Sequence, residues 1–228
     1  MAMRNDHYVD FAREERIARI ANEWRRAAQL QGHWNFNIIQ FVEHVLARRY
    51  KAKGNLNIEF FDREGSKEKE AKVTYRPLTL RIDRKIWERA RTGDAFARFV
   101  VAHEVGHILL HDHSAQPFSY DPAVQNQWCE DENSAEWQAN TFAYHFLLPD
   151  ELVRQHYDVD ALVEFCGVNE STARERLEKI VEADKRAARV KQSNGEACPE
   201  CMNFTLEENP EGSSCTRCGT KIPYLKAS

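Results

Sequence analysis

The sequence has no long apolar run, no large net charge and no leader-like start. No segment approaches the roughly 20 consecutive apolar residues of a membrane-spanning helix, and residues 1–10 hold no apolar core of the kind that a signal peptide needs. The 32 basic and 36 acidic residues give a net charge of −4, which excludes a chain held on nucleic acid by net charge alone. These absences predict a cytoplasmic protein without a membrane partner.

Aromatic residues are plentiful for so polar a chain. The sequence holds 12 Phe, 7 Tyr and 5 Trp at a mean hydropathy of −0.68, so a wholly disordered protein is excluded. The 228 residues are enough to bury a real core and to form one or two domains.

Along the chain, some segments have apolar residues at helical spacing and others have them at strand spacing. Residues 10–31 and 36–50 have helical spacing, and three alternating runs between Leu56 and Ile82 predict a small antiparallel sheet. Residues 95–110 form an apolar segment that is typical of a buried helix, and a further helix should run from 131 to 148. Two or three shorter helices follow over 150–180. The pattern predicts an α+β fold with a mainly helical core.

Four of the six cysteines form two C-x-x-C pairs. Cys198 and Cys201 are separated from Cys215 and Cys218 by residues 202–214. In a cytosolic chain such pairs point to a metal rather than to disulfides. Four thiolates at this spacing resemble the knuckles of a zinc ribbon, which closes a tetrahedral structural Zn²⁺ site. A redox pair is the alternative, but such a pair normally opens a helix beside a strand, and neither pair does so.

The cysteine-rich tail, 198–228, is too small to bury a core unaided, so the metal should fold it. Residues 184–197 are basic, small and polar, which predicts a linker after a first domain at 1–183. Ribbons recognise protein or nucleic acid, and the basic linker leaves a nucleic-acid contact open, although a charge run is usually a solvated face. The two other cysteines, Cys129 and Cys166, are predicted to be small core residues.

The segment from His103 to His107 is an H-E-x-x-H motif. Residues four apart share one face of a helix, so both imidazoles can bind one Zn²⁺ while Glu104 leans towards the open side of the metal. This arrangement suits activation of a water, because the carboxylate can take the proton that the metal has acidified. The alternative is a fortuitous cluster, but the neighbouring residues are apolar, and stray ionisable groups are costly to bury there.

A catalytic zinc also needs a third protein ligand. Glu136 is the best donor, because the rest of its helix face is small or apolar apart from Asn140. The alternative is that Glu136 only favours the positive N-terminal end of its helix. Rival donors are Glu130, Asp131, Glu132, His111 and His113, of which His111 is better suited to orienting a ligand or contacting substrate.

The sequence H-E-V-G-H-I-L-L-H, followed later by E-W-Q-A-N-T-F-A and F-L-L-P, resembles the ImmA/IrrE family of metallopeptidases. The resemblance covers residues 95–149 and continues more weakly to Ile180. It implies a zincin-like core in which His103, His107 and Glu136 bind the catalytic zinc and Glu104 is the general base and acid.

The resemblance also implies hydrolysis of a peptide bond in a helix-turn-helix transcriptional regulator or repressor, or relief of its repression. Gln138 stands where many relatives have an acidic residue, and the cysteine-rich tail is not a general family feature. Neither departure touches the implied ligands.

The donor that stabilises the oxyanion is left open among four residues, which are His111, His113, Tyr120 and Tyr144.

Two other functions stay open. The first is a metal-dependent sensor or adaptor that binds a regulator without cutting it. The second is a DNA-binding regulator that acts through the cysteine-rich tail and through residues 162–180, which would form a helix-turn-helix with Arg174, Arg176 and Lys179 on the recognition helix. Four acidic residues interrupt that basic face and favour a helical pair that packs on the core; they are Glu164, Glu170, Glu175 and Glu178.

Overall fold

The computed structural model describes residues 6–51, 55–63, 69–111, 129–192, 197–210 and 212–223. The chain divides into two compact units, residues 1–176 and 177–228, and each is described by itself. Within the described ranges, no helix has the length and apolar character needed to cross a bilayer.

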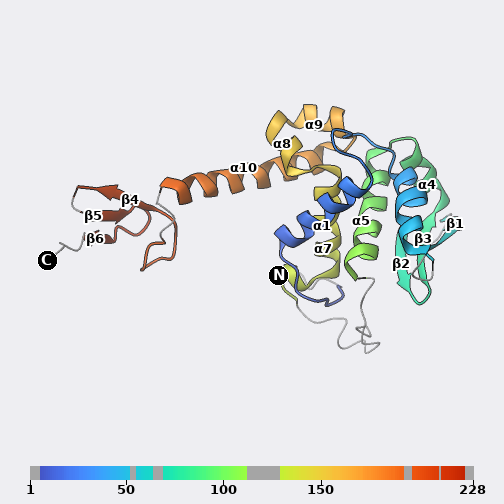
Figure 1. Ribbon diagram of the computed structural model, residues 1–228, viewed down its shortest axis with the longest axis horizontal. Coiled ribbons are helices and arrows are strands. Elements are labelled where there is room, and N and C mark those ends of the chain that lie inside the picture. Colours follow the sequence, from blue (N-terminus) through green and yellow to red (C-terminus); the bar gives the residue numbers. More distant parts are fainter. Residues whose placement is uncertain are drawn as a thin grey trace. The chain divides into compact units, whose positions relative to one another are not determined.

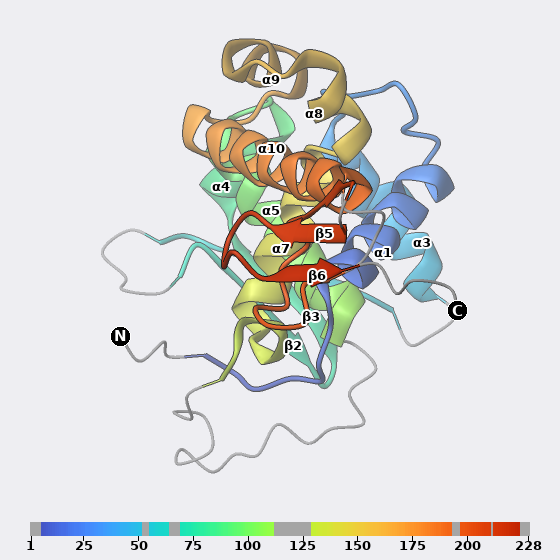
Figure 2. The same ribbon diagram turned by 90° about the vertical axis from the view of Figure 1, so that its left-hand side faces the viewer.

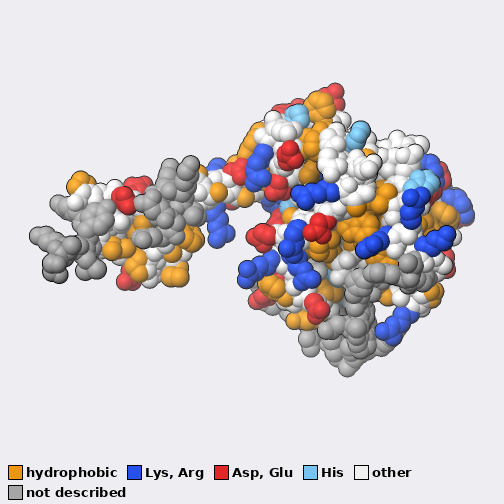
Figure 3. Space-filling model, in the orientation of Figure 1, with side chains coloured by type: hydrophobic (Ala, Val, Ile, Leu, Met, Phe, Trp, Pro, Cys, Tyr) orange, Lys and Arg blue, Asp and Glu red, His pale blue; other side chains and the backbone are white. Residues whose placement is uncertain are grey.

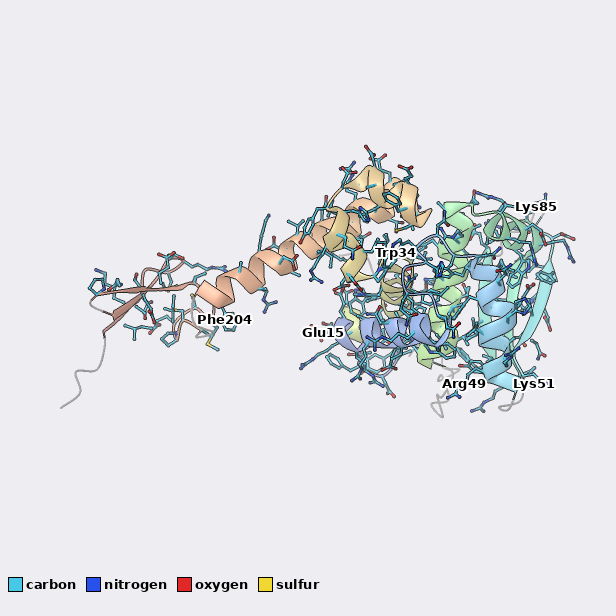
Figure 4. The ribbon with its side chains drawn as sticks, turned by 45° about the horizontal axis from the view of Figure 1, so that its top comes forward. Glu15, Trp34, Arg49, Lys51, Lys85 and Phe204 are labelled. Atoms are coloured by element: carbon cyan, nitrogen blue, oxygen red, sulfur yellow. The ribbon has the colours of Figure 1, made fainter. Side chains whose placement is uncertain are left out.

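The first unit begins with two helical segments at the predicted positions. Helix α1 spans Glu14–Ala27 and buries Ile17 and Ala21. The second segment is continuous and consists of α2 (Ile38–Gln40), the π-helical η1 (Phe41–Leu46) and α3 (Ala47–Tyr50). The Asn37 side chain caps it by accepting hydrogen bonds from the backbone of Ile39 and Gln40. In Figure 4, Glu15 marks the start of α1 and Lys51 follows the end of α3.

A three-stranded sheet follows, with the strands in the order β1-β3-β2. The strands are β1 (Asn57–Phe61), β2 (Ala71–Tyr75) and β3 (Leu78–Asp83). Strands β2 and β3 pair antiparallel, as predicted, but β1 and β3 pair parallel, so the expectation of a wholly antiparallel sheet is wrong. Alternating apolar residues reveal that a segment is a strand, but both pairings give the same alternation.

The sequence pattern did not predict the next helix, α4 (Arg84–Arg91). The Asp83 side chain caps it by accepting from the backbone of Lys85 at 2.8 Å. Trp87 is buried, and its ring meets Phe60 edge to face with 5.4 Å between centroids. Helix α4 therefore fixes the sheet to the helical part of the unit.

Helices α5 (Ala95–His111) and α7 (Ala135–Leu147) are the central pair, and a short 3₁₀ turn at Asp131–Asn133 leads into α7. Figures 1 and 2 show α5 and α7 side by side, and α1 packs against α7. Gly106 allows this close packing: a Cβ there would lie 3.0 Å from the Cα and O of Ala139 and 3.2 Å from the Cβ of Phe142. Any larger residue would push the two helices apart.

Three helices complete the described helical part: α8 (Asp150–His156), α9 (Val159–Cys166) and α10 (Glu170–Gln192). The buried Arg98 on α5 donates to the carbonyls of Cys166 and Gly167 and thereby holds the end of α9. Helix α10 has 23 residues, so it is not one of the short helices expected here. It includes residues 184–192, which composition marks as linker, because Ala, Lys, Arg and Gln favour helix and neither Gly nor Pro interrupts them.

The second unit contains a small antiparallel sheet, β4 (Leu206–Asn209), β5 (Gly212–Cys215) and β6 (Lys221–Pro223). Phe204, labelled in Figure 4, precedes β4. The apolar cluster of the second unit consists of Cys198, Leu206 and Cys215, with Cys201 and Ile222 packed against them. The whole structure is of the predicted α+β class.

Candidate metal centres

The structure brings His103, His107 and Glu136 together. The two histidines lie one turn apart on α5, with 3.0 Å between their Nε2 atoms. Glu136, in the first turn of α7, places Oε2 at 3.2 Å from Nε2 of His103 and Oε1 at 3.9 Å from Nε2 of His107. One ligand atom from each residue lies within 4.8 Å of the others, so the group can hold one metal ion.

The start of α7 is held by residues from the beginning of the chain. Ser134 caps the helix by accepting from the backbone of Trp137 at 2.9 Å, and its hydroxyl donates to the buried Asp6 carboxylate. The other Asp6 oxygen accepts from the backbone N of Glu136 at 3.3 Å. The backbone that carries the third candidate ligand is therefore fixed on both sides.

Asn140 orients His103. Its Oδ1 lies 2.8 Å from Nδ1 of the imidazole. An amide oxygen can only accept, so Nδ1 carries a proton, and Nε2, which faces Glu136, is the nitrogen that would bind a metal. Asn140 stood out in the sequence only as the polar residue on an apolar face, and its contact gives that position a role.

Glu104 lies beside this group and is almost completely buried, with 5% of its surface exposed. Within the described ranges, its Oε2 has no hydrogen-bond partner. Burial raises the pKa of Glu104 to about 7, the negative charge of Glu136 adds to the rise, and His103 opposes it. A carboxyl group with a pKa near neutrality can both take and return a proton.

Lys69 also contacts Glu136, with its Nζ at 3.3 Å from Oε1, the oxygen that faces His107. The hydrogen bond from His103 holds the pKa of Glu136 well below its usual value, and the charges of His107 and Lys69 act in the same direction. Lys69 precedes β2, and from the last residue of that strand Tyr75 donates its hydroxyl proton to the backbone oxygen of His107 at 3.2 Å. Sequence reasoning missed both residues, because their loop and strand carry no pattern that links them to α5.

His111 lies next to His107 rather than in the ligand group. Its Nδ1 is 3.2 Å from Nδ1 of His107, and its Nε2 is 3.1 Å from Oε1 of Gln138. Burial lowers the pKa of both imidazoles. This placement agrees with the orienting role expected for His111.

The other rival donors do not join the group. Among the described residues with metal-binding side chains, Glu130, Asp131 and Glu132 lie outside both candidate metal groups. His113 and Tyr120 lie outside the described residues. Tyr144 donates its hydroxyl proton to Glu175 at 2.6 Å, two helical turns from Glu136. That contact does not favour Tyr144 as the oxyanion donor.

The first group therefore has the donor set of a catalytic zinc: two imidazoles, one carboxylate and a neighbouring proton acceptor. The buried oxygen of Glu104, for which the described part of the chain offers no partner, also fits, because such an atom costs free energy unless a ligand or water satisfies it. Imidazole and carboxylate at this number and arrangement suit Zn²⁺.

The second group consists of the four cysteines of the two C-x-x-C pairs. Their sulfur atoms lie within 4.8 Å of one another, with 3.6 Å between Cys198 and Cys218 and between Cys201 and Cys215. All four thiols are free. Four sulfurs each about 2.3 Å from one Zn²⁺ would stand roughly 3.8 Å apart, so the spacing fits a tetrahedral site with no open position.

Two equivalent turns carry these cysteines. In each turn the first cysteine accepts from the residue four positions on and donates to the residue five positions on. Met202 and Asn203 make these bonds with Cys198, and Gly219 and Thr220 make them with Cys215, at 2.8–2.9 Å. The residue four positions on has a left-handed backbone in both, with φ of 54° at Met202 and 76° at Gly219.

Two threonines contact the thiols of the second group. The Oγ1 atoms of Thr205 and Thr220 lie 3.0 Å from the sulfurs of Cys215 and Cys218, respectively. These contacts lower the pKa of both thiols, that of Cys215 to about 6. A lower pKa favours the thiolate, which is the form that binds a metal.

The basic face expected for a recognition helix is incomplete. Arg176 is buried and donates to the backbone oxygen of Leu148 at 3.2 Å and to the carboxylate of Asp150, and Arg174 pairs with Glu170. In Figure 3, acidic and basic side chains are interspersed on the visible face of the first unit. Arg176 is thus a packing residue and is not available to a phosphate.

Comparison with known proteins agrees with the geometry of the first group. The family model Peptidase_M78, described as the IrrE N-terminal-like domain, matches residues 54–178. That range is more than half of the chain and contains His103, Glu104, His107 and Glu136. Searches of curated proteins and of solved structures gave no match. The chain belongs to the Peptidase M78 family, a family of metallopeptidases.

Proposed function

We propose that the protein is a zinc-dependent metalloendopeptidase that hydrolyses a peptide bond in a protein substrate. The observation that carries the proposal is the position of Glu104. Its buried oxygen has no partner among the described residues, and its carboxyl group interacts electrostatically with His103 and Glu136, two of the three clustered ligands. Family membership supports the same class of reaction.

When bound to His103, His107 and Glu136, Zn²⁺ supplies Lewis-acid chemistry that polarises the scissile carbonyl and the attacking water. Glu104 takes a proton from that water while the water oxygen forms a bond to the carbonyl carbon. The same carboxyl group then returns the proton to the amine nitrogen when the C–N bond breaks. Burial, which raises the pKa of Glu104, favours uptake of that proton.

Strand β2 is a suitable place for the substrate backbone. It forms one edge of the sheet, and Tyr75 at its end contacts the backbone of α5 beside His107. An edge strand offers backbone groups that can pair with an extended peptide. Lys69, just before β2, is largely exposed and adds positive charge at the Glu136 side of the site.

We infer that the substrate is a helix-turn-helix transcriptional regulator or repressor. The resemblance of the two helix motifs to ImmA/IrrE peptidases supports this choice. The four-cysteine group would hold a structural zinc, giving one catalytic and one structural ion per chain, and the ribbon around it would contact protein or nucleic acid. Free thiols spaced as zinc ligands and the small apolar cluster around them support the structural role.

The test is cleavage of purified candidate regulators by the parent protein and by Glu104→Gln, followed by mass spectrometry. The variant keeps the shape of the side chain but cannot accept the proton, so cleavage should slow by about 10²–10⁴-fold while the zinc content stays the same. Glu130→Gln is the matched control, because Glu130 is exposed and outside both metal groups. It should cleave like the parent.

The same experiment addresses the adaptor alternative. Release of a regulator from its DNA by the parent and by Glu104→Gln to the same extent, without any cleaved product, would contradict the peptidase and favour a binding role.

A further inference from the structure

Gln138 and His111 form a chain of hydrogen bonds that ends on a candidate metal ligand. The amide nitrogen of Gln138 donates to the backbone oxygens of Asp10 at 2.8 Å and Glu132 at 2.7 Å. Its amide oxygen lies 3.1 Å from Nε2 of His111, whose Nδ1 lies 3.2 Å from Nδ1 of His107. All the side chains in this chain are buried or nearly so.

The chemistry of the groups fixes the direction of each hydrogen bond. Carbonyl oxygens only accept, so the Gln138 nitrogen faces them and its oxygen faces His111. His111 must then carry its proton on Nε2. A histidine that binds a metal through Nε2 carries its proton on Nδ1 and donates it to a neighbour, and Nδ1 of His111 lies 3.2 Å from Nδ1 of His107. Nδ1 of His111 therefore accepts, and Nδ1 of His107 donates.

We propose that Gln138 and His111 are positioning residues that hold His107 in the tautomer whose Nε2 has a free lone pair, and thereby raise the affinity of the first group for zinc. This inference rests on the proposed function, because it assumes that the group binds the metal. Asn140 likewise keeps a proton on Nδ1 of His103. Two amide side chains of α7 would thus direct Nε2 of both imidazoles of α5 towards the ion.

The amide of Gln138 is held by two strongly fixed acceptors. The segment around Asp10 pairs with the segment around Glu132, through Val9 N to Asn133 O at 2.8 Å and Ala12 N to Glu132 O at 3.0 Å. Rotating the amide by 180° would lose both of its donated bonds and place its oxygen against two carbonyls. Each lost bond costs about 1 kcal/mol, so one orientation prevails.

The first test is a measurement on metal-free protein. Two-dimensional ¹H–¹⁵N NMR of the histidine rings distinguishes a protonated ring nitrogen from a bare one. We expect the proton of His107 on Nδ1 and that of His111 on Nε2. A proton on Nε2 of His107 would overturn the inference, and this readout needs neither zinc nor activity.

The second test compares zinc affinity in two variants by competition with a chelator. Gln138→Met removes the oxygen that accepts from His111, and we expect its zinc affinity at the first group to fall by about 10-fold or more. Gln138→Glu keeps an acceptor but loses both donors, so it should melt earlier than the parent and bind zinc within about threefold of it. Gln40→Met, on an exposed position of α2, is the control and should match the parent.

The outcomes separate this inference from the proposed function. Equal loss of zinc affinity in Gln138→Met and Gln138→Glu would show that Gln138 is merely structural and would overturn the inference. If Gln138→Met does not fold, the NMR measurement of ring protonation in the parent protein decides whether the inference holds. If the parent binds zinc and has the expected tautomers but cleaves nothing, the proposed peptidase fails while the positioning role stands.

Discussion

The two candidate metal groups differ in what their surroundings can do without a metal. His103, His107 and Glu136 stand on two long helices whose packing involves Gly106 and a large apolar core. The four cysteines stand on two short turns beside one small sheet, and two of them belong to the buried cluster itself.

The number of protein ligands differs as well. The cysteine group offers four sulfurs to one ion and leaves no open position, whereas the histidine group offers three ligands and has Glu104 beside it. A closed site stabilises a fold, and an open site next to a proton acceptor carries out chemistry. Under the proposed function, an ion at the cysteine group would stabilise the fold and an ion at the histidine group would take part in the reaction.

Removal of the metal from each group tests this difference in role most strongly. The double change Cys198→Ser and Cys201→Ser should remove one of two bound zinc ions and unfold residues 197–223, because structural zinc contributes about 10–16 kcal/mol in small zinc domains. Atomic emission gives zinc per chain, and the dispersion of backbone amide signals in NMR reports folding.

His103→Gln is the counterpart at the first group. It should also cost one zinc per chain, but the helical unit should keep its amide dispersion, since its core does not depend on the ion. Native dispersion of residues 197–223 in the cysteine variant, or collapse of the helices in His103→Gln, would contradict the division of roles.

Gly106→Ala tests whether the histidine group depends on the close packing of α5 and α7. The added Cβ would lie 3.0 Å from the backbone of Ala139, which cannot move aside as a flexible side chain can. We expect a loss of about 1–3 kcal/mol in the free energy of unfolding and weaker zinc binding, because Glu136 moves away from the histidines when the helices separate. Thermal unfolding and chelator competition measure the two effects.

The cysteine group serves as an internal control in the same molecule. Its zinc should be released from Gly106→Ala at the same chelator concentration as from the parent. Unchanged zinc affinity at the histidine group would show that its geometry does not depend on the close approach of α5 and α7.

Local periodicity predicts part of the first site and leaves the rest open. The helical period alone places His103 and His107 on one face, and the structure agrees. The position of Glu136 depends on how closely α5 and α7 approach, which is a tertiary property, so only the family resemblance pointed firmly to it. Lys69 was missed for the same reason, since nothing in a charged loop indicates which helix it will meet.

The fold shows the same limit. The segments of the first sheet were found, but the parallel pairing of β1 and β3 was not, because strand alternation is the same for both directions. Helix α4 was overlooked although Asp83 is a good cap and Ile86, Trp87 and Ala90 share its buried face. Residues 184–192 belong to α10, because Ala, Lys and Arg favour helix, and the polar composition that predicts a linker does not reveal that it is helical.

The smallest effect concerns the two equivalent turns of the cysteine group. Met202 has a left-handed backbone, with φ of 54°, at the position that Gly219 occupies in the other turn, and its side chain is 73% exposed. A left-handed conformation costs a residue with a Cβ roughly 1–2 kcal/mol, and glycine removes this cost. Ordering the more flexible glycine on folding costs about 0.5–1 kcal/mol, which offsets part of that gain. Met202→Gly should therefore stabilise the zinc-bound second unit by about 0.5–1 kcal/mol, whereas Gly219→Ala should destabilise it. Zinc release from the cysteines during urea titration measures both shifts, and a destabilising Met202→Gly would show that the two turns are not equivalent.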